Sequence, residues 1–88
     1  MTYRVELRPA AARELRKLDR PARDRIAKVL ALLAEDPRPP AAKMLVSDDL
    51  LRLWRVRTGD YRVIYSTDDQ TVLVLVVNVR HRREAYER

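Results

Sequence analysis

The sequence predicts an α+β fold in which an N-terminal strand and an antiparallel helical hairpin pack on a small four-stranded, largely antiparallel sheet. A short alternating segment comes first, two segments with helical periodicity follow, and three strand-like segments close the chain. This gives the order β-α-α-β-β-β. The 88 residues contain no internal repeat and no low-complexity tract, so we expect one domain over residues 1–88.

The first half of the chain carries one strand and both helices. Residues 3–7 alternate between apolar and charged side chains, as in a half-buried strand. Pro9 suits a helix start, and apolar residues then recur at helical spacing to about Leu18. Pro21 interrupts this pattern and opens a second helix that ends near Ala34, with an apolar stripe formed by Ile26, Val29, Leu30 and Leu33. The short break between the two helices predicts an antiparallel hairpin.

The second half is predicted to form a loop and three strands. Residues 35–49 contain three prolines and four acidic residues, which favours a loop. Strands are expected over residues 50–57, 61–66 and 71–79. The last of these shows no alternation, which is typical of a strand covered on both faces. We therefore place it in the middle of the sheet, between the third strand and, by elimination, the first.

The only glycine of the chain sets the register of the predicted hairpin. If Gly59 and Asp60 are its two loop residues, Gly in the first position suits a type II′ turn. Arg57 then lies opposite Arg62, and alternation places Arg55 on the same face. The opposite face, which can pack under the helices, carries Trp54, Val56, Tyr61, Val63 and Tyr65. A four-residue loop keeps this pairing, whereas a three-residue loop with a bulge changes it.

Three arginines on one sheet face suggest an anion site. Like charges directly opposite each other destabilise a sheet, and no obvious carboxylate shares this face. A bound phosphate would satisfy the bidentate guanidinium groups. The C-terminal segment adds further candidates that could converge on the same groove: Arg80, His81, Arg82, Arg83 and Tyr86. The simpler alternatives are that His81 is an ordinary surface histidine and that Tyr86 caps the core.

The overall charge is consistent with a polyanionic partner. The formal net charge is +6, and 16 of the 19 cationic residues are arginines, which favour planar phosphate recognition. The cations on the two helices are more simply interpreted as a solvated face. The chain has no cysteine, no signal-peptide pattern and no apolar run long enough to cross a bilayer, which predicts a cytoplasmic protein without membrane contact.

The motif R-x-R-x-G-D-Y-R-V-I-Y, followed by H-R-R-x-x-Y, closely resembles the RelE/ParE toxin superfamily of toxin–antitoxin modules, on the RelE side. The resemblance covers essentially the whole chain. It implies a ribosome-dependent endoribonuclease that cuts messenger RNA in the A site without metal or cofactor. The ribose 2′-oxygen attacks the adjacent phosphorus and leaves a 2′,3′-cyclic phosphate. The implied partners are an acidic, partly disordered antitoxin, the message and the ribosome, with operator DNA bound only through the toxin–antitoxin complex.

The resemblance also implies site residues. Arg62 matches the hairpin arginine of the family, Arg82 the tail arginine and Tyr86 the C-terminal tyrosine. Two family lysines are replaced here, by Arg55 and Leu53. An arginine hardly releases a proton, so His81 and Tyr86 remain for proton transfer, and the arginines are expected to stabilise charge. The residues expected to bind RNA phosphates are Arg55, Arg57, Arg80 and Arg83.

These departures leave two other functions open. A ParE-like toxin would bind DNA gyrase and hydrolyse nothing. A catalytically degenerate member would only bind its antitoxin and operator DNA. The retained hairpin and tail residues favour the nuclease, whereas the replaced lysines favour its rivals.

Overall fold

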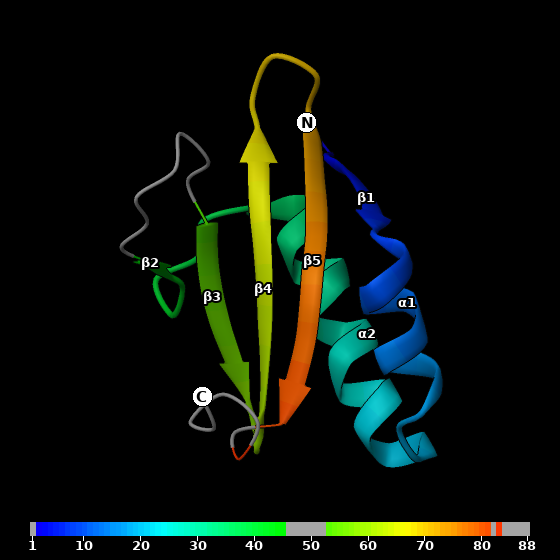
Figure 1. The fold of residues 1–88 in the computed structure, drawn as a ribbon. Coiled ribbons are helices and arrows are strands. Elements are labelled where there is room, and N and C mark those ends of the chain that lie inside the picture. Colours follow the sequence, from blue (N-terminus) through cyan, green and yellow to red (C-terminus); the bar gives the residue numbers. More distant parts are fainter. Residues whose placement is uncertain (1, 46–52, 82, 84–88) are drawn as a thin grey trace.

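The computed structural model describes residues 2–45, 53–81 and 83, and in these it shows two helices and five strands (Figure 1). In chain order they are β1 (Arg4–Leu7), α1 (Pro9–Arg16), α2 (Arg20–Glu35), β2 (Lys43–Leu45), β3 (Leu53–Thr58), β4 (Tyr61–Asp68) and β5 (Leu73–His81). The α+β class predicted from the sequence is confirmed.

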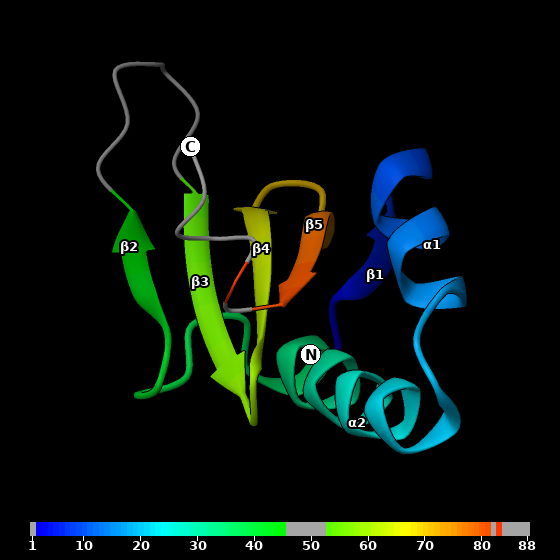
Figure 2. The ribbon, with the colours of Figure 1, turned by 60° about the horizontal axis from the view of Figure 1, so that its bottom comes forward.

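The strands form one sheet in the order β1-β5-β4-β3-β2. β5 pairs in parallel with β1 and antiparallel with β4, so the last strand lies between the third strand of the predicted set and the first, as predicted. Figure 2 shows the two helices near the β1 and β5 side of this sheet, with β2 at the opposite edge. The edge of the sheet formed by β3 and β2 is therefore the part that the helices leave more open.

The predicted count of four strands is wrong, because residues 43–45 form β2 inside the segment predicted as a loop. This strand pairs antiparallel with β3 and extends the sheet at its edge. It has only three residues and no alternating pattern, and the prolines before it gave a strong loop signal. The remainder of that predicted loop after residue 45, and residues 50–52 of the next predicted strand, lie outside the described residues.

The β3–β4 hairpin has the predicted register, with Arg57 opposite Arg62 and Trp54 opposite Tyr65. Gly59 has a φ of 58°, and among the described residues Val72 is the one non-glycine residue with positive φ. Asp60 therefore has negative φ, as a type II′ turn requires and a type I′ turn does not allow. The turn also lies close to α2, since a Cβ at Gly59 would be 2.8 Å from Nη1 of Arg25.

Both helices begin near the prolines that predicted them. Pro9 is the first residue of α1, and in α2 the Asp19 side chain caps the helix by accepting a hydrogen bond from the Ala22 backbone at 3.1 Å. α1 ends at Arg16, two residues before the expected end, and α2 runs to Glu35. No helix in the described part of the chain is long and apolar enough to span a membrane.

The core lies between the helices and one face of the sheet. Trp54 and Tyr61 are partly buried against it, so the predicted apolar face of the hairpin is confirmed. Side-chain burial of this kind contributes roughly 1.5–3 kcal/mol for each large apolar residue. The buried cluster comprises Ala11, Ile26, Leu33, Val56, Val63, Tyr65, Val74, Val76 and Val79.

Candidate nucleic-acid interface

Three arginines lie side by side across three strands on the sheet face opposite the core. Arg57 of β3 pairs with Arg62 of β4, and Arg62 pairs with Arg80 of β5. Cross-strand partners point to the same face of a sheet, so the three guanidinium groups form one row. Arg57 is exposed, whereas Arg62 and Arg80 are half-buried. The sequence predicted that Arg57 and Arg62 share this face. It named Arg80 only as one of the C-terminal residues that could converge on the same groove.

A second basic row lies two residues further along the same face. Lys43 of β2 pairs with Arg55 of β3, and Arg55 pairs with Ile64. Lys43 was not a predicted site residue, because its strand was not predicted, and only the pairing with β3 places it here. We call the surface formed by the two rows the basic face, defined by Lys43, Arg55, Arg57, Arg62 and Arg80.

A β-bulge places Arg80 on the basic face. Between Ile64 and Tyr65 the register of β4 with β5 shifts, so that Asn78 pairs with Ile64 but Val76 pairs with Tyr65. Val77 is therefore the extra residue. Before it, the even-numbered residues of β5 are buried in the core, and after it the buried residue is Val79. Without this bulge, strict alternation would direct Arg80 into the core rather than beside Arg62.

The bulged part of β5 is held by α1. β1 pairs with β5 only as far as Val76, so the edge of β5 beyond that point faces the helix. There Oε1 of Glu14 accepts a hydrogen bond from the Val79 backbone at 2.9 Å and another from Nδ2 of Asn78 at 3.5 Å. The Glu14 carboxylate thus satisfies the backbone N–H of Val79, which no neighbouring strand accepts. Val79 directly precedes Arg80, so this contact holds the part of β5 that orients Arg80.

The two rows of the basic face contain five cationic residues and no acidic residue. The neutral residues Ile64 and Asn78 continue the row of Lys43 and Arg55. The Nε atoms of Arg55 and Arg62 are buried without a hydrogen bond, although both residues make another interaction in the structure. The arginine stems therefore lie against the sheet. Adjacent cations repel one another, and a bound anion would offset that repulsion.

His81 lies on the other face. It pairs with Tyr61, whose side chain packs against the core, and the two rings meet edge to face with centroids 5.2 Å apart at 89°. Its Nδ1 accepts a hydrogen bond from the Arg83 backbone at 3.1 Å. The bulge that turns Arg80 toward the basic face thus places His81, in the strand register, on the face opposite the hairpin arginines. The predicted catalytic role of His81 stays a prediction.

The remaining predicted site residues are only partly described. Arg83 follows β5 and is exposed. Arg82 and Tyr86 lie outside the described residues, so their predicted roles stay predictions. In the described ranges, no group of three or more His, Cys, Asp or Glu residues could hold a metal ion.

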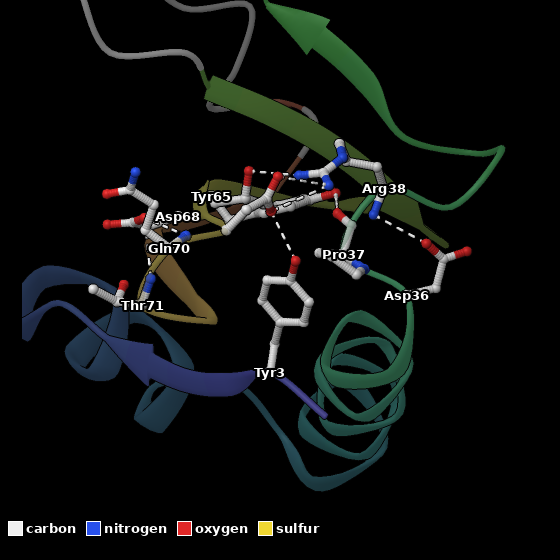
Figure 3. A network of polar contacts seen from close by, with 10 residues as sticks. Tyr3, Asp36, Pro37, Arg38, Tyr65, Asp68, Gln70 and Thr71 are labelled. Carbon is white, nitrogen blue, oxygen red and sulfur yellow. Dashed lines mark hydrogen bonds and ion pairs between the residues drawn. The ribbon is translucent and has the colours of Figure 1, made fainter. Parts of the chain in front are cut away.

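A separate polar cluster lies at the other end of β4 (Figure 3). The Tyr3 hydroxyl donates to Asp69 at 2.8 Å, and Arg38 binds both carboxylate oxygens of Asp69 at 3.2 Å. The buried Tyr65 hydroxyl donates to the carbonyl oxygen of Pro37 at 2.7 Å. These contacts fasten the segment after α2 to the sheet, so we assign this cluster a structural role.

Comparisons with known proteins place this chain among the toxins of type II toxin–antitoxin systems. A family profile described as the ParE toxin of the type II toxin–antitoxin system parDE matches residues 5–86. The mRNA interferase toxin RelE of Escherichia coli K12 is 33% identical, over 98% of this chain and 92% of the relative. The chain therefore belongs to the ParE toxin family of type II toxin–antitoxin systems and is RelE-like within it.

Solved structures agree with this assignment. The archaeal RelE–RelB complex of Pyrococcus horikoshii OT3 superposes with a TM-score of 0.81 at 29% identity, covering 93% of this chain and 97% of that one. The RelBE2 toxin–antitoxin complex of Mycobacterium tuberculosis gives a TM-score of 0.82 at 28% identity, with 93% of each chain covered.

Proposed function

We propose that this protein is a ribosome-dependent messenger-RNA endonuclease that inhibits translation, and that the basic face is its phosphate-binding surface. The observation that carries the proposal is the row formed by Arg57, Arg62 and Arg80. Three adjacent guanidinium groups supply forked donors for a phosphodiester, which is the group that an RNA-cleaving site must hold. The relative named mRNA interferase toxin supports the same reaction.

In the proposed reaction the ribose 2′-oxygen attacks the adjacent phosphorus, and the bond from phosphorus to the 5′-oxygen breaks. The products are a 2′,3′-cyclic phosphate and a 5′-hydroxyl. Negative charge grows on the phosphoryl oxygens as the phosphorus becomes five-coordinate. Arg62 at the centre of the row, with Arg82 from the tail, would stabilise that charge without changing protonation. Arg55, Arg57, Arg80 and Arg83 would hold the flanking phosphates.

Proton transfer must accompany the attack and the departure of the 5′-oxygen. The sequence offered His81 and Tyr86 for this role. The pairing of His81 with Tyr61 directs the histidine away from the basic face. A role for His81 therefore requires the message to pass around the end of β4 and β5. Tyr86 would act from the tail. Both roles are open to direct test by substitution.

We further propose a cognate antitoxin as the natural partner of this chain. The RelE–RelB and RelBE2 structures are toxin–antitoxin complexes. An acidic, partly disordered segment would fold over the basic face and offset the repulsion between its cations. Operator DNA would be bound through that complex rather than by the toxin alone.

Gyrase inhibition is the second candidate. The description of the matching family profile, a ParE toxin of a parDE system, favours it, as do Leu53 and Arg55 at positions where RelE-type members carry lysine. Under this alternative the basic face would contact a protein or a DNA–protein complex, and no phosphodiester bond would break.

One paired experiment separates the two functions. Purified toxin is added to a cell-free translation reaction, and primer extension maps breaks in the message; the same preparation is assayed for inhibition of supercoiling by DNA gyrase. The proposal predicts breaks at ribosome-occupied codons, only while translation proceeds, with supercoiling unaffected. Intact message with blocked supercoiling would instead establish the gyrase inhibitor.

A further inference from the structure

Lys43 is the one residue of the basic face whose side chain can give up a proton. It lies on β2 directly opposite Arg55, and it is exposed. We infer that Lys43 is a catalytic residue of the proposed nuclease and acts as the general acid that protonates the departing 5′-oxygen. This inference rests on the proposed cleavage reaction and assigns one step of it to one side chain.

Register brings Lys43 within reach of a phosphate on the basic face. Its diagonal neighbour on β3 is Arg57, and residues in that relation are about 7–8 Å apart. A phosphate held between the two basic rows would therefore have Arg57 and Arg62 on one side and Lys43 and Arg55 on the other. An extended lysine side chain covers most of the distance that separates the rows.

The chemistry of the side chain distinguishes Lys43 from its neighbours. Guanidinium groups stay protonated under all ordinary conditions, so Arg55, Arg57 and Arg62 can hold a phosphate but cannot exchange a proton with it. A lysine ammonium is a compact donor on a flexible stem and does transfer protons in active sites. The other two lysines of the chain, Lys17 and Lys28, lie at the end of α1 and on α2.

The step balances without a co-reactant. As the 2′-oxygen forms its bond to phosphorus, the bond to the 5′-oxygen breaks and its electron pair moves onto that oxygen. The ammonium of Lys43 gives its proton to the 5′-oxygen, which leaves as a hydroxyl, and solvent returns a proton to the amine. The proton of the 2′-hydroxyl passes to water in the site. The arginines meanwhile stabilise the phosphoryl oxygens.

The test compares two messages in single-turnover cleavage on programmed ribosomes. One has the natural 5′-oxygen at the cleaved position, and the other has a bridging sulfur there. A thiol is a far stronger acid than an alcohol, with a pKa of about 8.5, so a sulfur leaving group departs without a proton donor. Lys43→Arg keeps the charge and length of the side chain but removes the transferable proton, and Lys28→Arg on α2 is the matched control.

We expect Lys43→Arg to cleave the oxygen message about 10²–10⁴-fold more slowly than the unchanged protein and to cleave the sulfur message at nearly the unchanged rate. Lys28→Arg should cleave both messages normally. Arg62→Ala should lose activity on both, because charge stabilisation does not depend on the leaving group.

Two outcomes overturn the inference while the proposed function stands. Lys43→Arg could cleave the oxygen message at the unchanged rate, or it could lose activity equally on both messages, which would make Lys43 a binding group. Failure of the unchanged protein to cleave either message would refute the proposed function itself, and the role of Lys43 with it. Thermal unfolding and ribosome binding of each variant show whether a loss of rate reflects the chemistry.

Discussion

The carboxylate of Glu14 on α1 accepts the backbone N–H of Val79 on β5 at 2.9 Å, immediately after the bulge that turns Arg80 onto the basic face. A helix residue thus fixes the strand geometry on which the arginine row depends. The interaction joins the first helix to the last strand, and it links the packing of the core directly to the direction of a candidate site residue.

Replacing Glu14 should therefore damage both stability and the site. Glu14→Ala leaves the Val79 N–H without its acceptor, and hydrogen bonds to charged groups contribute about 1.5–3 kcal/mol. We expect a loss of that size in the free energy of unfolding, measured in urea. Glu14→Gln keeps an acceptor oxygen and should lose less.

The control is Glu6→Gln, which removes the exposed ion pair with Arg4 and should change stability by less than about 1 kcal/mol. Equal losses in Glu14→Ala and Glu6→Gln would show that the contact with Val79 does not hold the bulge. The effect on cleavage should follow the effect on the bulge, with Glu14→Ala slower than Glu14→Gln.

The sequence predicted the hairpin in detail because one glycine fixed its turn. Gly59 is the only glycine in the sequence, and a glycine adopts a positive φ without a steric cost. The alternation on either side of it then determined the pairing of Arg57 with Arg62. The apolar face of the hairpin followed from the same alternation, and the order of the strands followed from the unbroken apolar run of the last one.

The bulge and the short edge strand could not be predicted. The segment around Val77 is an unbroken apolar run, so it carries no alternation that a shift of register would disturb. The faces of Arg80 and His81 both depend on that shift. Lys43 was missed for another reason, since a three-residue strand after a proline-rich segment exists only through its pairing with β3.

The buried tyrosine of the core should report on stability at high pH. Burial raises the pKa of Tyr65 to about 12, from an ordinary value of 10.0. A raised pKa means that the neutral form is favoured in the folded state, so its contribution is complete below pH 10 and is lost as the pH rises toward 12. Tyr65→Phe removes this titration and leaves the carbonyl oxygen of Pro37 without its donor.

We expect Tyr65→Phe to lower the free energy of unfolding by about 1–3 kcal/mol at neutral pH, because a buried acceptor is left unsatisfied. The difference between the two proteins should shrink above about pH 10. Urea unfolding at several pH values measures both effects. A difference that stays constant through the alkaline range would contradict the assigned role of the hydroxyl.

The cluster around Asp69 should act at the opposite end of the pH scale. Hydrogen bonds from Tyr3, and then from Arg38, hold the pKa of the Asp69 carboxyl below its usual value. A lowered carboxyl pKa stabilises the fold above the unfolded-state pKa, and this contribution is lost as the pH falls through the folded-state pKa. Asp69→Asn should therefore be less stable than the unchanged protein at neutral pH.

That difference should narrow as the pH falls below about 4, where the carboxyl is protonated in the unfolded chain. Asp24→Asn on the exposed side of α2 removes the same charge elsewhere on the surface and is the matched control. The measurement is thermal unfolding from pH 2 to 7 for the three proteins, a range chosen to span roughly the ordinary carboxyl pKa. Parallel stability curves for Asp69→Asn and the unchanged protein would show that the Asp69 carboxylate does not contribute to the pH dependence of stability.

The most direct test of the basic face compares Arg62 with an arginine of the helix side. Single-turnover cleavage of ribosome-bound message is measured for Arg62→Ala and for Arg23→Ala, an exposed arginine on α2 that carries the same charge. If the row binds and stabilises the reacting phosphate, Arg62→Ala should raise the barrier by about 2.7–4 kcal/mol, or roughly 10²–10³-fold in rate, with Arg62→Lys recovering only part of it. Arg23→Ala should cleave at the unchanged rate. Equal rates for Arg62→Ala and Arg23→Ala would contradict the central claim, because overall charge rather than the arginine row would then account for the activity.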